Sequence, residues 1–100
     1  MKRTVWKFDV DVAKLDANSE VAIAMPMGAE VLTAREQGDK VCVWARVNPD
    51  EKRVVKRMFG VCGTGHPAPF TDYLGTAMLF GGSLVLHVFV VPDGTRSVPR

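Results

Sequence analysis

Hydrophobic and polar residues alternate with period two along much of this chain, a pattern that indicates half-buried β-strands. In Thr4–Val12 the apolar residues fall on one face and the charged residues on the other. Residues 13–19 read as a loop, with one helical turn as the alternative. A short strand at 20–24 follows, and Pro26 and Gly28 predict a turn after it.

The next two strands, Glu30–Gln37 and Lys40–Val47, form a predicted β-hairpin, because Gly38-Asp39 suits a type II′ turn. The register of this hairpin pairs apolar residues on a core face: Leu32 with Ala45 and Ala34 with Val43. The reverse face is mixed in character and carries Thr33, Arg35, Cys42, Trp44 and Arg46.

A strand at Arg53–Cys62 starts polar and becomes apolar, and a second hairpin then pairs Tyr73–Phe80 with Ser83–Val91 about Gly81-Gly82. Its register places Thr76 opposite His87 and leaves both faces apolar. We expect one face in the core, with Tyr73, Ala77, Leu79, Leu84, Leu86, Val88 and Val90. The other face carries Leu74, Met78, Phe80, Val85 and Phe89.

About seven short strands separated by turn signals predict an all-β fold. We expect a single-domain antiparallel β-sandwich at residues 1–91, with a small barrel as the alternative. Helix should be nearly absent. Residues 92–100 are rich in Pro, Gly and Arg, which predicts a flexible C-terminal tail.

Composition narrows the functional classes. A chain of 100 residues with 47% hydrophobic residues suits one domain, and a net charge of +2 is too small to indicate nucleic acid or an anionic membrane as a partner. No apolar run approaches the ~20 residues that span a bilayer. Charged residues interrupt any signal-peptide pattern at the N-terminus, so we expect a cytoplasmic protein with reduced thiols.

The stretch Gly63-Thr64-Gly65-His66 is the candidate ligand-binding segment. Successive N–H groups in a glycine-rich turn can form an anion-binding nest, and His66 could contact a phosphate or act as an acid or base. The alternative is a crossover turn in which His66 bonds local backbone. The stretch lacks the third glycine of a dinucleotide fingerprint and the lysine of a P-loop.

Metal binding and catalysis find little support in the sequence. Cys42, Cys62, His66 and His87 could form a Cys₂His₂ set, but their spacing is not that of structural zinc sites. Cys62 lies four residues from His66 without an evident orienting acid. We therefore expect two unbridged thiols, no metal, no cofactor and no enzymatic activity, with His87 held structurally by Thr76.

Two surfaces are candidates for protein contacts. Trp44 with Arg35 and Arg46 has the composition of an interface hot spot, although a cation–π contact that covers the sheet is the alternative. The second apolar face of the second hairpin lacks an evident cover within the chain, which predicts a homodimer. The residues of that predicted interface are Leu74, Met78, Phe80, Val85 and Phe89.

Six short motifs spread over Thr4–Phe89 resemble a family of small uncharacterised proteins of bacteriophages and prophages, whereas the tail departs from that pattern. They are Trp6-Lys7-Phe8, Met25-Pro26-x-Gly28-Ala29, Trp44-Ala45, Gly63-Thr64-Gly65-His66-Pro67, Tyr73-Leu74-Gly75-Thr76 and His87-Val88-Phe89. The resemblance implies a phage-encoded protein in the cytoplasm of an infected bacterium, without implying an activity.

The function we expect is that of a non-enzymatic module that engages a host or phage protein. The alternative is a protein that binds a nucleotide or other anion in the Gly63–His66 loop. The positions of the arginines discriminate between the two functions. Arginines that converge on the Gly63–His66 loop would favour ligand binding, whereas arginines that line a flat face with Trp44 would favour a protein partner.

Overall fold

The computed structural model of the chain describes residues 2–92, and their regular structure is almost entirely β-strand. The strands are β1 (Thr4–Val10), β2 (Glu20–Pro26), β3 (Glu30–Gln37), β4 (Lys40–Val47), β5 (Val54–Gly63), β6 (Asp72–Leu79) and β7 (Leu84–Val91). Two single 3₁₀ turns, η1 (Val12–Lys14) and η2 (Phe80–Gly82), are the helical elements of this part. The all-β prediction is confirmed. The tail predicted at 92–100 lies, apart from Pro92, outside the described residues.

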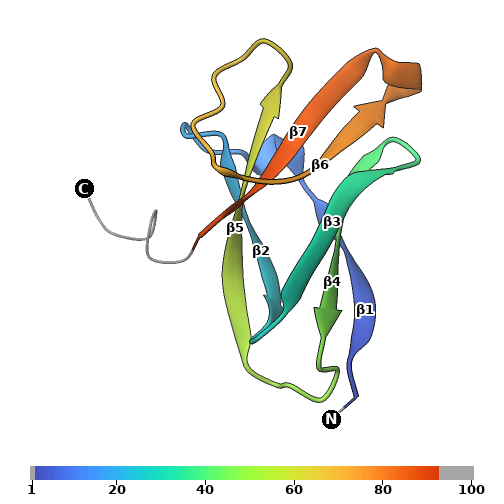
Figure 1. The fold of residues 1–100 in the computed structure, drawn as a ribbon, viewed down its shortest axis with the longest axis vertical. Coiled ribbons are helices and arrows are strands. Elements are labelled where there is room, and N and C mark those ends of the chain that lie inside the picture. The colour runs from blue at the N-terminus through green and yellow to red at the C-terminus, as the bar shows by residue number, and fades with distance from the viewer. Residues whose placement is uncertain (1, 93–100) are drawn as a thin grey trace.

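All seven strands belong to one sheet, in the order β1-β4-β3-β6-β7-β5-β2. The sheet curls until its two end strands, β1 and β2, come near one another, which gives a nearly closed barrel (Figure 1). This is the alternative architecture rather than the two-sheet sandwich. Neighbouring strands are antiparallel except β3 and β6, which run parallel and are registered at Ala34 and Gly75.

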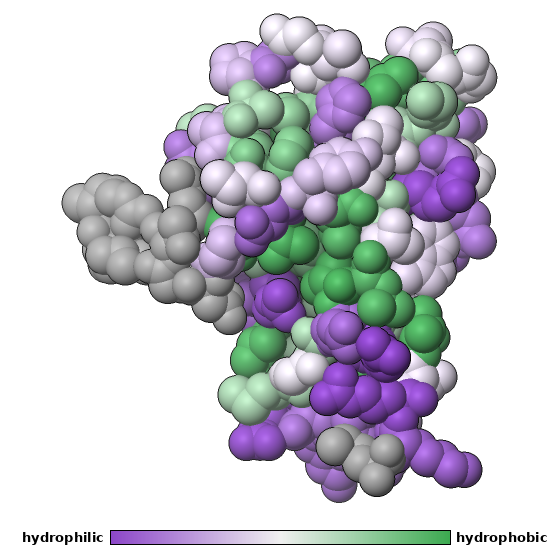
Figure 2. Space-filling model, viewed as in Figure 1, coloured by the Kyte–Doolittle hydropathy of each residue, from purple (hydrophilic) through white to green (hydrophobic). Residues whose placement is uncertain are grey.

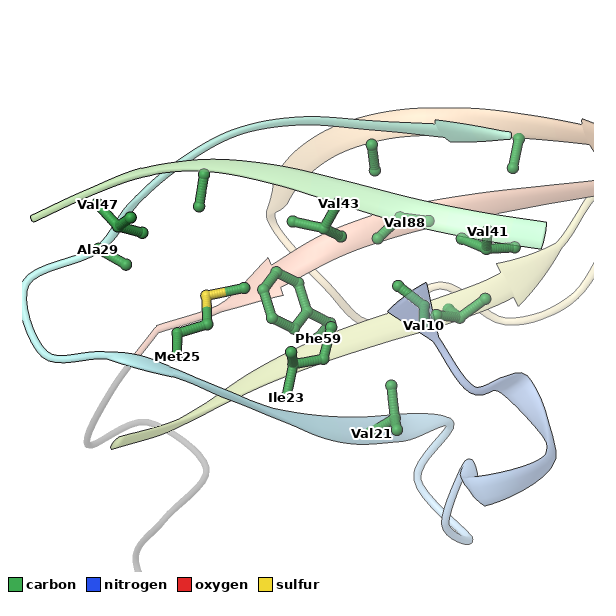
Figure 3. Packing of buried hydrophobic residues seen from close by; sticks show 14 of the residues in the cluster. Val10, Val21, Ile23, Met25, Ala29, Val41, Val43, Val47, Phe59 and Val88 are labelled. Carbon is green, nitrogen blue, oxygen red and sulfur yellow. The ribbon is translucent and has the colours of Figure 1, made fainter. Parts of the chain in front are cut away.

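The core fills the inside of the curled sheet, because alternate residues of each strand point inward. Phe59 is the largest fully buried side chain. Figure 3 shows its ring in the middle of the cluster, with Met25 and Ile23 on one side and Val43 on the other. Burial of each such side chain contributes roughly 1.5–3 kcal/mol relative to exposure.

The first hairpin confirms one predicted pair and corrects another. Ala34 faces Val43, and Gly38 has the positive φ of +62° that the predicted turn needs. Leu32, however, lies in a β-bulge, so that Val31 rather than Leu32 faces Ala45. A bulge adds one residue to a strand and shifts the alternation beyond it.

The second hairpin also keeps part of its predicted register. Thr76 faces His87 as predicted, but the strands stop at Leu79 and Leu84, so the connection is the four-residue loop 80–83 and not a two-residue turn. A second irregularity lies between Tyr73 and Gly75. It places Tyr73 beside Phe89 on the outer face and lets Leu74 pack against the core, the reverse of the predicted faces.

Side-chain carboxylates extend the junction of β3 and β6 beyond its backbone pairing. The Met78 N–H donates to Glu36 Oε1 at 2.8 Å, and the Phe80 N–H donates to Asp39 Oδ1 at 3.1 Å. The bond from Met78, with a smaller contribution from Arg35, lowers the pKa of Glu36 below its usual value. Both acids therefore tie the second hairpin to the first.

Candidate functional site

The Gly63–His66 stretch forms a tight turn at the end of β5. The His66 N–H donates to the Gly63 carbonyl oxygen at 3.1 Å, and Gly65 has a φ of +87°, which glycine adopts without strain. This is the local backbone hydrogen bond that a crossover turn, the alternative to a ligand-binding segment, would give His66. The imidazole of His66 packs over Gly63 and remains exposed.

A chain of hydrogen bonds fixes this turn to the outer face of the sheet. Thr64 Oγ1 lies 2.7 Å from His87 Nε2, and Thr76 Oγ1 lies 3.1 Å from His87 Nδ1. The Tyr73 hydroxyl bonds Thr76 in turn, at 2.5 Å. Register reasoning identified Thr76 as the partner of His87. It missed Thr64 and Tyr73, because one lies in the turn and the other reaches along its own strand past the irregularity.

An open hollow of about 450 Å³ lies between this turn and the loop after β1. Gly63 and His66 line it, whereas Thr64 and Gly65 do not. The rest of its wall is Leu15, Ala17, Asn18, Ser19, Val61, Cys62, Pro67, Pro69 and Leu86. In the described part of the chain, the ionisable side chains that line the hollow are the imidazole of His66 and the thiol of Cys62.

The arginines are engaged elsewhere. Arg53 binds the Glu51 carboxylate at 2.8 Å and lowers the pKa of Glu51 to about 2. Arg57 donates to the Ala29 carbonyl oxygen at 2.9 Å. None of these side chains lines the hollow beside the Gly63–His66 turn, so the cationic convergence that would favour an anion is not found among the described residues.

The two cysteines are buried and unbridged. Burial raises the pKa of both thiols, and a hydrogen bond to Asp9 contributes for Cys42, whose Sγ lies 3.6 Å from Asp9 Oδ1. At neutral pH both are protonated thiols, which are poor nucleophiles. Within residues 2–92, no three His, Cys, Asp or Glu side chains are grouped so that they could hold a metal ion.

Trp44 lies half-buried on the outer face of β4, between Lys7 of β1 and Thr33 of β3. Arg46, two residues along the same strand, pairs with Glu30 at 2.8 Å. Arg35 lies on the outer face of β3 and pairs with its neighbour Glu36 at 3.6 Å. The two arginines therefore flank Trp44 on one face of the sheet.

Only some residues of the predicted dimer interface are exposed in the structure. Leu74 packs against the core, and Phe89 is covered by the rings of Phe70 and Tyr73, whose centroids lie 5.5 Å and 5.7 Å away. Met78 and Phe80 remain 58% and 59% exposed. With Leu84 and Val85 they form an apolar end to the hairpin, here called the hairpin patch. This end of the molecule lies at the upper right of Figure 2, where green residues adjoin pale ones.

Residues 1–97 match a protein family described as a domain of unknown function (DUF7352). The chain belongs to this family. No curated protein and no solved structure matches the chain. In this DUF7352 member, none of the helical segments within residues 2–92 is long and apolar enough to cross a membrane.

Proposed function

We propose that this protein is a non-enzymatic interaction module that forms a homodimer and engages a further protein. The hairpin patch carries the proposal. Met78, Phe80 and Leu84 keep more than a third of their surface exposed, although the same chain buries a well-packed core. Exposed apolar clusters of this kind mark interaction sites in small proteins.

The backbone of the hairpin patch supports the same proposal. Phe80 has a φ of +52°, a conformation that a bulky residue adopts at a cost. The bond from its N–H to Asp39 holds the residue in place. The strained backbone leaves the ring of Phe80 exposed to solvent. A binding role for that ring would explain why the strain is retained. A second copy of the chain is the proposed occupant, because a twofold axis places one apolar patch against its equivalent.

The face with Trp44 is the proposed site for a different protein. Trp and Arg are the side chains that most often dominate binding energy at interfaces. The salt bridges of Arg35 and Arg46 are exposed and contribute little to stability, so a partner can replace them at low cost. The resemblance to phage proteins supports a host or phage protein as the partner, in the cytoplasm of an infected bacterium.

The anion-binding alternative is not favoured by these contacts. An anion at the Gly63–His66 turn would rely on the backbone N–H groups and His66, because Arg53 and Arg57 bind other groups. These groups would compensate poorly for the hydration that a phosphate loses when it binds there.

Photo-crosslinking tests the proposed dimer. A benzophenone amino acid placed at Phe80 should give a covalent dimer on irradiation at micromolar concentration. The same group at Met27, which is exposed in the turn between β2 and β3, should not. Equal yields at the two positions, or none at Phe80, would overturn the proposal.

A further inference from the structure

We infer that the hollow beside the Gly63–His66 turn binds a small uncharged heteroaromatic molecule of the nucleobase class. The proposed function makes no use of this hollow. Its volume of about 450 Å³ falls within the roughly 300–1,000 Å³ of small-molecule sites. The loops on both sides of it lie at the upper end of the barrel in Figure 1.

The lining suits a flat and neutral ligand. Leu15, Val61 and Leu86 give the hollow apolar walls, and Pro67 and Pro69 add rigid surfaces on the other loop. Among residues 2–92, no carboxylate, ammonium or guanidinium group lines the hollow. A charged ligand would lose hydration there without gaining an ionic partner, whereas an aromatic ring gains from burial.

Three polar side chains supply the hydrogen-bonding capacity: Asn18, Ser19 and His66. Within residues 2–92 none of these side chains makes a hydrogen bond, although their backbone groups do. The Asn18 amide offers a donor and an acceptor side by side. The edge of a nucleobase presents the complementary pair, which asparagine binds with two hydrogen bonds.

The loops that carry these side chains are fixed before any ligand arrives. The Asn18 N–H donates to Asp16 Oδ1 at 2.8 Å, and the Val61 N–H donates to the Ser19 carbonyl oxygen at 2.9 Å. On the other side, Thr64 bonds His87 at 2.7 Å. A ligand would therefore order little additional chain on binding, which favours affinity.

An NMR titration with adenosine and with uridine tests the inference, with ribose and inorganic phosphate as the comparison probes. At millimolar concentration at least one nucleoside should shift the amide signals of Asn18, Ser19, Gly63 and His66 in a saturable way. Ribose and phosphate should leave these signals in place.

Variants complete the test. Asn18→Ala and His66→Ala change exposed loop side chains and should each weaken nucleoside binding about tenfold. Lys52→Ala, in the loop that joins β4 to β5, should leave it unchanged. The inference fails if neither nucleoside shifts these amides, if phosphate or ribose shifts them equally, or if the two loop variants bind as the natural chain does. Loss of the dimer with nucleoside binding intact would overturn the proposed function alone.

Discussion

A Cβ atom on Gly75 would lie 1.9 Å from the carbonyl oxygen of Ala34. These residues are registered opposite one another where β3 and β6 run parallel, which is where the two hairpins join into one sheet. A glycine is therefore required for the barrel to close at this point. Its role is steric, since its φ is not in the left-handed region.

Gly75→Ala should destabilise the fold by about 3 kcal/mol or prevent folding, because the methyl group must push β3 away from β6. Denaturant unfolding followed by circular dichroism measures the change. Gly28→Ala is the matched control: nothing lies within 4 Å of its added Cβ, and only its φ of +82° is strained. We expect a cost of about 1 kcal/mol there. Equal losses at the two positions would contradict the steric account.

A second glycine makes room for a ring. A Cβ atom on Gly60 would lie 2.5 Å from the Phe70 ring, which covers Phe89. Gly60→Ala should displace the ring and destabilise the protein by about 1–3 kcal/mol. In a Phe70→Ala background the same change should be neutral or stabilising. A double-mutant cycle measures this coupling, and additive effects would show that the ring does not rest on Gly60.

The sequence predicted the strands well, because alternation of apolar and polar residues was clear in most of them. It could not predict which of two β architectures the strands adopt, since the parallel junction of β3 with β6 depends on Ala34 and Gly75, which are distant in sequence. The bulges at Leu32 and Leu74 carry no local signal, and each one changed the faces assigned nearby.

The candidate site was predicted only in part. The glycine-rich turn and the pair of Thr76 with His87 follow from local residues. The hollow could not be predicted, because part of its wall is formed by Asn18 and Ser19, which lie more than forty residues before Gly63 in the chain. The bond from Thr64 to His87, which fixes the turn, also joins distant residues. The cover of Phe89 by Phe70 was not predicted, because the loop that carries Phe70 is short and contains two prolines.

Acid should weaken the junction between the hairpins. The bond from the Met78 N–H favours the ionised form of Glu36, whose pKa is lowered in the folded protein. Its contribution to stability is therefore fully present above its ordinary pKa of 4.5 and is lost as pH falls through the lowered value. Glu36→Gln keeps an acceptor but cannot titrate. The difference in unfolding midpoint between the two proteins should shrink from about pH 6 to about pH 3, and a constant difference would refute the assignment.

The self-association of the natural chain is the most direct test of the proposed function. Equilibrium sedimentation at micromolar concentration should give about twice the chain mass of 10.9 kDa. Phe80→Asp, which places a charge in the hairpin patch, should return the mass to that of one chain with the circular dichroism spectrum unchanged, and Met27→Asp should not. A natural chain that stays at 10.9 kDa across this range would contradict the account.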